Sequence, residues 1–170
     1  MRSQLTRRLV LSALFAALIC VATFVVKIPV PGSPAAYMNA GDAIIYTAGV
    51  ALAGPWAAAA AGIGSAFADL IVGAPVYAPA TLVIKAAMGF IVGAALHGRK
   101  ASWRYLLFMI IASLVMVAGY GIYETFLYGL QPALAYSPFN LIQAAFGVAI
   151  GVPLAILVRR IMPETWIDKP

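Results

Sequence analysis

Long apolar runs, separated by short polar or proline-rich segments, make up most of the chain. The first run, Leu9 to Val26, has 18 uncharged residues and would be about 27 Å long as a helix, enough to cross a bilayer with modest tilt. Further helices are expected at about 39–54, 55–72, 79–96, 103–128 and 138–158. The pattern predicts an all-α integral membrane protein, a compact bundle of six transmembrane helices forming a single membrane domain of residues 1–170.

Residues 43–68 contain no charge and could form one long tilted helix or two short helices that break at Gly54-Pro55-Trp56. The basic residues favour two helices. Nine of the eleven fall into three clusters: Arg2, Arg7 and Arg8; Arg99, Lys100 and Arg104; Arg159, Arg160 and Lys169. Cytoplasmic loops are rich in Lys and Arg, so an even number of spans must separate the clusters. Both termini are then cytoplasmic, with Trp56, His97, Trp103 and Trp166 near the inner ends.

Composition supports this assignment to the membrane. Of the 170 residues, 64% are hydrophobic and 9% are charged, and the mean hydropathy is +0.99, well above the soluble range. The net charge of +6 reflects the three basic clusters rather than a nucleic-acid surface. Cys20 is the only cysteine, so no intramolecular disulfide can form. The first apolar run exceeds a typical signal-peptide core and is expected to remain as a span.

Few polar groups interrupt the spans, and counting along the expected helices places them in the outer half of the bilayer. They are Asp42, Asp69, Lys85, Glu124, Asn140 and Gln143. The inner halves carry no charge before the cytoplasmic flanks. A channel or proton relay needs polar groups at successive depths, whereas a pocket open to the outside needs them only in the upper half. The expected outer loops are 27–38, 73–78 and 129–137.

These residues are candidates for a substrate site. Lys85 and Glu124 would supply polar contacts, Asn140 and Gln143 orientation, and Tyr77 and Tyr123 stacking; Asn39, Asp42 and Asp69 complete the set. The segment from Lys27 to Asn39, with three prolines, would be an extended cover. Structural alternatives remain open. Lys85 could pair with Asp69 or Glu124, Asp42 and Asn140 could cap their helices, and Tyr128 and Tyr136 could belong to an aromatic belt.

The motifs of several enzyme classes are absent from the sequence. There is no G-x-x-x-x-G-K-[ST], no G-x-S-x-G and no H-E-x-x-H, and His97 is the only histidine. ATP binding through a P-loop and hydrolase chemistry are therefore not expected, and neither a metal nor a cofactor is indicated. The chain is not expected to be an enzyme.

In order along the chain, Asn39-x-Gly41-Asp42, Gly54-Pro55, Gly62-x-Gly64-Ser65, Ala68-Asp69-Leu70, Tyr77-x-Pro79-x-Thr81 and Ile84-Lys85 form a fairly specific block. The sequence from about 5 to 160 resembles the substrate-binding S component of energy-coupling factor (ECF) vitamin transporters, in particular riboflavin, pyridoxine and hydroxymethylpyrimidine types. The resemblance implies six helices with cytoplasmic termini in a prokaryotic plasma membrane, and a vitamin site under the loop after the first helix.

The resemblance also implies partners, namely a membrane T component and two ATPase subunits. The family's A-x-x-x-A motif, which contacts the T component, is matched by Ala13 and Ala17. Ligand contacts differ among members, so the vitamin does not follow from the resemblance. Two other functions remain open at this point: a proton-coupled secondary transporter that uses Asp69 and Glu124, and a structural membrane subunit whose charge pairs hold helices together.

Overall fold

The computed structural model describes residues 2–163, and the predictions for Trp166 and Lys169 lie outside this range. The described residues form six helices and one β-hairpin. In chain order the elements are α1 (Arg2–Val25), β1 (Lys27–Pro29), β2 (Tyr37–Asn39), α2 (Gly41–Ala51), α3 (Gly54–Ile71), α4 (Ala78–Leu96), α5 (Trp103–Tyr128) and α6 (Leu130–Ile161). Four helices are long and apolar enough to cross a membrane, namely α1 from Gln4 onward, α4, α5 and α6.

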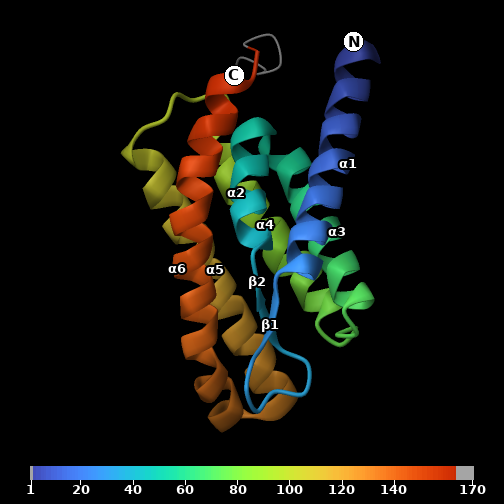
Figure 1. The fold of residues 1–170 in the computed structure, drawn as a ribbon, viewed down its shortest axis with the longest axis vertical. Helices are drawn as coiled ribbons and strands as arrows, with labels where there is room; N and C mark the ends of the chain where they lie inside the picture. The colour runs from blue at the N-terminus through green and yellow to red at the C-terminus, as the bar shows by residue number, and fades with distance from the viewer. Residues whose placement is uncertain (1, 164–170) are drawn as a thin grey trace.

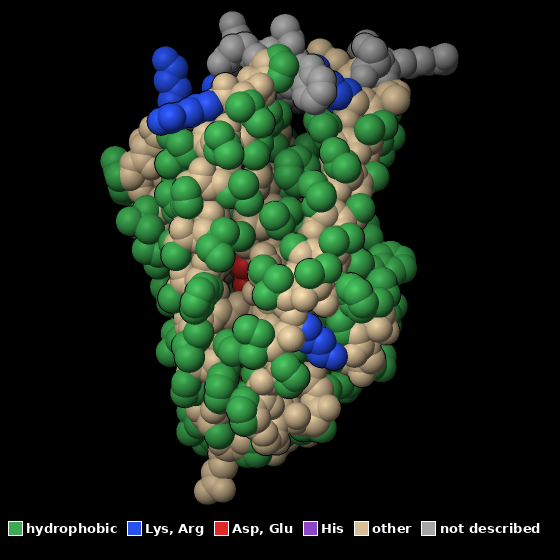
Figure 2. Space-filling model, viewed as in Figure 1, with side chains coloured by type: hydrophobic (Ala, Val, Ile, Leu, Met, Phe, Trp, Pro, Cys, Tyr) green, Lys and Arg blue, Asp and Glu red, His purple; other side chains and the backbone are tan. Residues whose placement is uncertain are grey.

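The bundle has two distinct ends (Figure 1). Both ends of the described chain and the segment 97–102 lie at one end, which we call the terminal end. The β-hairpin and the turn between α5 and α6 lie at the opposite end, the hairpin end. Lys and Arg side chains gather at the terminal end, while hydrophobic side chains cover most of the visible face (Figure 2). The described basic clusters therefore lie at one end of the bundle, as an even number of helices between them predicts.

Two helices, rather than one, occupy residues 41–71, and the break between them falls at Leu52 and Ala53. Pro55 lies in the first turn of α3, where its missing N–H costs nothing. The other helix, α2, has only 11 residues and is about 16 Å long, roughly half of a hydrocarbon core of about 30 Å. The predicted span 39–54 is thus a short helix.

The short helix α2 is the centre of the bundle. It contacts α1, α3, α4 and α6, and every residue in it except Ile44 is buried. Figure 1 shows it in the half of the bundle nearer the terminal end, with β2 leading into it from the hairpin end. Asp42, in its first turn, therefore lies deeper than the sequence count suggests.

Small residues bring α3 and α4 close together. A Cβ atom added at Gly89 would lie 2.5 Å from the carbonyl oxygen of Ala57, and one added at Gly62 would lie 2.6 Å from that of Leu82. A carbon and an oxygen atom do not approach so closely without a bond, so only glycine permits this spacing of the two backbones.

The predicted outer loop 129–137 is wrong, because α6 begins at Leu130. Gly129 alone joins α5 to α6, with a φ of 89° that glycine adopts without strain. Pro138 lies inside α6 rather than at its start. Proline is tolerated within transmembrane helices because neighbouring groups satisfy the backbone that it leaves open. Proline was therefore a poor marker of the helix boundary.

The predicted extended cover is a short antiparallel hairpin, in which Lys27 pairs with Asn39 and Pro29 with Tyr37.

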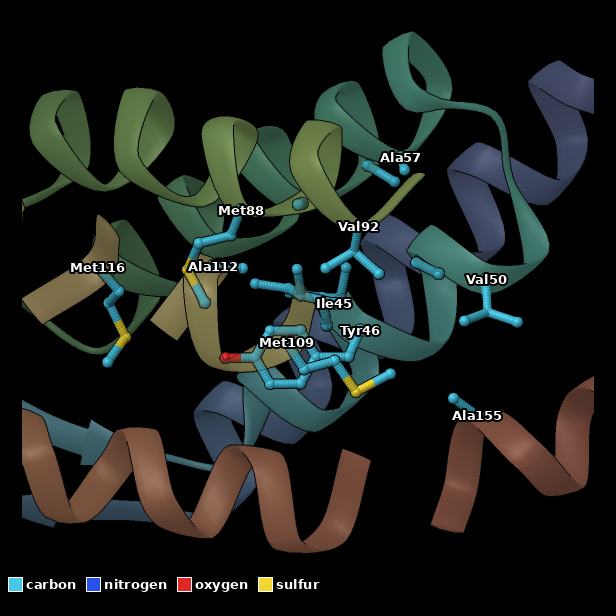
Figure 3. Close-up of a cluster of buried hydrophobic side chains, with 14 of the residues drawn as sticks. Ile45, Tyr46, Val50, Ala57, Met88, Val92, Met109, Ala112, Met116 and Ala155 are labelled. Atoms are coloured by element: carbon cyan, nitrogen blue, oxygen red, sulfur yellow. The ribbon is translucent and has the colours of Figure 1, made fainter. Parts of the chain in front are cut away.

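Away from the hairpin, buried hydrophobic side chains fill the space between the helices (Figure 3). Ile45 and Tyr46 of α2 meet Met88 and Val92 of α4 and Met109 of α5 in this cluster. This part of the described core is thus apolar.

Candidate functional site

A polar cavity lies under the β-hairpin, between the hairpin and the apolar core. Its volume is about 30 Å³, room for one or two water molecules. The lining residues come from α1, the hairpin and the four helices α3 to α6. They are Thr23, Val30, Ala36, Tyr37, Asn39, Ser65, Asp69, Tyr77, Thr81, Lys85, Tyr120, Glu124, Tyr136, Asn140 and Gln143. Residues more than a hundred positions apart thus meet in one place.

A buried ion pair forms the floor of the cavity. The Lys85 ammonium on α4 donates to the Asp42 carboxylate on α2, and the two side chains are 2% and 0% exposed. Gln143 on α6 donates from Nε2 to Asp42 Oδ2 at 2.8 Å. The Met116 sulfur lies 3.1 Å from Lys85 Nζ and marks where the apolar core begins. Lys85 therefore pairs with Asp42, not with Asp69 or Glu124.

Glu124 on α5 belongs to one wall, where it accepts two hydrogen bonds. The Tyr77 hydroxyl donates to Oε1 and Asn140 Nδ2 donates to Oε2, each at 3.3 Å. The Tyr77 ring lies 6.2 Å from the Tyr120 ring, centroid to centroid. This wall combines a buried carboxylate, 1% exposed, with two aromatic rings.

Asp69 on α3 belongs to the opposite wall. Its Oδ1 accepts a hydrogen bond from the Tyr37 hydroxyl of the hairpin. Burial, together with the nearby Asp69 carboxylate, raises the pKa of Tyr37, so this hydroxyl keeps its proton and remains a donor. The second oxygen of Asp69, Oδ2, and the Ser65 hydroxyl are buried without a hydrogen-bond partner among the described residues.

The hairpin covers the cavity and is fastened at several points. The backbone N–H of Asn39 donates to Gln143 Oε1 at 3.0 Å, and the Tyr136 hydroxyl donates to the Gly32 carbonyl at 2.9 Å. Lys27 Nζ donates to the Val72 carbonyl at 2.8 Å. These bonds tie the hairpin to α6 and to the end of α3.

The structure brings together most of the residues that the sequence singled out. Lys85, Glu124, Asn140, Gln143, Tyr77, Asn39 and Asp69 all line the cavity. Asp42 lies directly beneath the lining, behind Lys85. Tyr123 does not line the cavity; its ring packs against Tyr77 at 5.8 Å, and its hydroxyl donates to the Val76 carbonyl.

Three structural alternatives are wrong. Asp42 does not cap α2, because the N-cap residue is Ala40 and the N–H of Gly41, the first residue of the helix, donates to Asn39 Oδ1. Asn140 does not cap α6, because it lies ten residues after the first residue of that helix, Leu130. Tyr136 does not belong to an aromatic belt, since it is buried and lines the cavity. Each of these side chains lies at the site, Asn140 and Tyr136 in the lining and Asp42 beneath it.

Sequence reasoning missed Ser65, Thr81 and Tyr120, and misassigned Tyr136. A signal was present, since each of them precedes a predicted site residue by four positions. Ser65 precedes Asp69, Thr81 precedes Lys85, Tyr120 precedes Glu124, and Tyr136 precedes Asn140. Residues four apart share one helix face. Each of α3 to α6 thus contributes one polar pair to the cavity.

A second concavity, an apolar groove of about 550 Å³, runs between α1 and α3 on the outside of the bundle. Ala13 and Ala17 line it from α1, and Ile63 and Phe67 face them from α3. Ala13 and Ala17 are exposed. The motif that the resemblance linked to a partner is thus accessible in this chain.

Sequence comparison links the chain to transport proteins. A family model described as "ECF-type riboflavin transporter, S component" matches residues 3–160. An uncharacterized protein from Pyrococcus woesei is 42% identical over 147 residues, which are 85% of this chain and 97% of that protein. The thiamine precursor transporter HmpT of Lactococcus lactis subsp. cremoris is 29% identical over 154 residues, covering 91% of this chain and 89% of the transporter.

Comparison of structures agrees with this. The fold is similar to the crystal structure of an S component for biotin from an ECF-type ABC transporter, with a TM-score of 0.66 over 95% of this chain and 93% of that chain. The sequence identity is 20%, so the likeness concerns the fold alone. The family model, which matches residues 3–160, shows that this protein belongs to the ECF-type riboflavin transporter S component family, the substrate-specificity subunits of ECF importers.

Proposed function

We propose that this chain captures a small, water-soluble vitamin or vitamin precursor from outside the cell, in the cavity under the hairpin. The distribution of polar side chains carries this proposal. They converge on one covered cavity near the hairpin end, and apolar side chains fill the core beyond it (Figure 3). A conducting path needs polar groups at successive depths. A capture site needs them in one place, as found here.

In this proposal the hairpin end faces the outside of a prokaryotic cell and both termini face the cytoplasm. The gathering of Lys and Arg at the terminal end supports that orientation (Figure 2). All six helices would lie within the membrane, with α2 enclosed by its neighbours.

Different side chains of the lining would stack on the ligand, make polar contacts with it and fix its orientation. The rings of Tyr77 and Tyr120 offer apolar faces for a flat heterocycle. Lys85 and Glu124 present polar groups from the floor and one wall, and Asn140 and Gln143, both held by hydrogen bonds, would fix the orientation of the ligand. Tyr123 supports Tyr77 from behind.

Binding requires the hairpin to move. The cavity holds about 30 Å³, whereas small-molecule pockets are roughly 300 to 1,000 Å³. Opening it breaks four contacts of the hairpin, made by Lys27, Gly32, Tyr37 and Asn39. Two of these bonds join neutral groups, at about 0.5–1.5 kcal/mol each, and two involve a charged group, at about 1.5–3 kcal/mol each, so opening costs roughly 4–9 kcal/mol. Re-forming these contacts over a bound ligand would close the lid.

The partners in this proposal are a membrane T component and two ATPase subunits, which would supply the energy of transport from ATP hydrolysis. The groove beside Ala13 and Ala17 is the docking face for the T component. It is apolar, exposed and lined by small residues, which permit close helix approach within a membrane. Apart from the transported ligand, the proposal includes no cofactor.

Two measurements test the proposal. Native mass spectrometry of the purified protein should reveal a bound vitamin or precursor. Uptake of that compound into vesicles should need the partner subunits and ATP. Ala17→Trp should abolish uptake and leave the dissociation constant unchanged, whereas the control Ala118→Trp, at an exposed position of α5, should alter neither.

Undiminished uptake by the Ala17→Trp variant would remove the docking face from the proposal. Uptake by this chain alone, driven by a proton gradient without ATP, would replace the proposed importer subunit with a secondary transporter.

A further inference from the structure

The cavity carries more acidic groups than basic ones. Three carboxylates, those of Asp42, Asp69 and Glu124, lie in or directly beneath it, against the single ammonium of Lys85. Lys85 is bound to Asp42. The salt bridges of the described residues include no cation paired with Asp69 or Glu124. If the three carboxyl groups and Lys85 are all ionised, the formal charge of the site is −2.

The acidic excess is not the only sign of a missing partner. Asp69 Oδ2 and the Ser65 hydroxyl are buried and lack hydrogen-bond partners in the described part of the chain, although the two side chains are only 4% and 3% exposed. Both line the cavity, and they lie four residues apart on one face of α3. Leaving a buried polar group unsatisfied costs roughly 1–3 kcal/mol, and such groups are rare in native proteins.

We propose that the ligand of this site is a nitrogen heterocycle that carries a cationic or amine group, and that Asp69 and Ser65 bind this group from the α3 wall. The inference rests on the proposed function and deepens it. Asp69 Oδ2 would accept an N–H from the ligand, and the Ser65 hydroxyl would accept a second. A positive charge would offset the buried carboxylate in a way that a water molecule in the same space cannot.

The aromatic lining also favours a cation. Tyrosine rings present negative faces, which attract positive groups. Two lysines already use this property: Lys85 Nζ lies 5.5 Å from the centre of the Tyr120 ring, and Lys27 Nζ, which is exposed and does not line the cavity, lies 5.4 Å from that of Tyr37. An anionic ligand would instead meet two carboxylates that form no salt bridge among the described residues.

Glu124 then acts at the far side of the ligand. Its two oxygens already accept hydrogen bonds from Tyr77 and Asn140, so it depends less on a ligand donor than Asp69 does. Replacing Asp69 should therefore weaken binding more than replacing Glu124. This order separates a specific amine site at Asp69 from a general attraction by negative charge.

The test is calorimetric titration of the full-length protein, purified in detergent and freed of retained ligand, at pH 7. Thiamine and pyridoxamine are the positively charged probes. Pyridoxine, which has a hydroxymethyl group in place of the aminomethyl group of pyridoxamine, is the matched neutral probe, with riboflavin as a second neutral probe and biotin as the anion. At least one charged probe should bind, and more tightly than every neutral or anionic probe.

In Asp69→Asn the affinity for the charged probe should fall by about 30-fold or more, as expected when one partner of a buried charge pair is lost. Glu124→Gln should have a smaller effect. Ser65→Ala provides a second route if Asp69→Asn does not fold, since removing an unpaired hydroxyl leaves the melting temperature unchanged or higher and should weaken the charged probe several-fold. The control Ser113→Ala removes a buried hydroxyl that bonds Tyr46 outside the cavity, and its affinity should match the wild type.

Riboflavin, pyridoxine or biotin binding as tightly as the charged probes, or unchanged affinity in Asp69→Asn, would overturn the amine site and leave the capture function standing. Failure of both charged probes to bind would also overturn the amine site. If, in addition, no small molecule co-purifies and no probe binds, the proposed function fails as well.

Discussion

The buried pair of Asp42 and Lys85 provides the sharpest test of how the site is built. Each single variant, Asp42→Asn or Lys85→Met, leaves one charge without its partner at a position that is 0–2% exposed. Removing one partner of a buried ion pair costs about 3–5 kcal/mol, because the remaining charge stays desolvated. We expect both single variants to be destabilised by this amount.

The double variant Asp42→Asn with Lys85→Met should recover most of that loss. Methionine has a length similar to lysine and would meet the Met116 sulfur, which lies 3.1 Å from Lys85 Nζ. The asparagine side chain would keep a carbonyl oxygen to accept the hydrogen bond from Gln143. Replacing a buried ion pair with hydrophobic residues of similar volume is often neutral for stability. The double variant likewise removes both buried charges, so the two mutations should not add.

Thermal unfolding in detergent measures the effect. One kcal/mol shifts the melting temperature of a protein of this size by about 2–4 °C, so each single variant should melt roughly 6–20 °C lower and the double variant close to the wild type. Lys27→Met is the matched control, since Lys27 is exposed and makes one hydrogen bond, to a backbone carbonyl. Single variants that melt within about 2 °C of the wild type, or a double variant as unstable as the sum, would refute the reasoning.

Two further predictions concern helix packing and the lid. Gly89→Ala would place a Cβ 2.5 Å from the Ala57 carbonyl oxygen, so α3 and α4 must separate, at a cost of about 1–3 kcal/mol, and the melting temperature should fall. The control Gly121→Ala adds a Cβ with nothing within 4 Å and should melt at or above the wild type. Equal melting temperatures of the two variants would contradict the close packing of α3 and α4. Tyr37→Phe removes the hydrogen bond from the hairpin to Asp69. Because a hydrogen bond to a charged group contributes about 1.5–3 kcal/mol, the ligand should dissociate roughly tenfold faster or more, as measured by stopped-flow fluorescence. An unchanged dissociation rate would show that this bond does not hold the hairpin closed.

Local chemistry predicted the helices well where each boundary carries its own signal. The predicted bounds of α5, 103–128, are those of the structure, because a basic segment precedes the helix and a glycine follows it. Depth along the helices was also predictable. Asp69 lies near the end of α3, Lys85 two turns into α4, and Glu124 one turn before the end of α5, since a fixed rise per residue converts sequence position into height.

Contacts between helices were less predictable, because they depend on which faces meet. The partner of Lys85 is Asp42, and this choice follows from the burial of α2 among its neighbours. An 11-residue helix inside the bundle gives the same apolar signal as a membrane span. The start of α6 was predicted too late because Pro138 was taken to mark a helix boundary. Proline is tolerated inside transmembrane helices, where neighbouring groups satisfy the backbone that it leaves open.

The two acids of the walls distinguish a functional site from a structural one. A chain that needed charge only to hold its helices together would pair each carboxylate, as Asp42 is paired with Lys85. Asp69 and Glu124 are also buried and are bound by neutral donors instead, although an uncompensated charge in the membrane interior is costly. Local departures from the best packing are expected where a protein binds something. The acid without a full set of donors, Asp69, is therefore the residue whose replacement should separate ligand binding from stability.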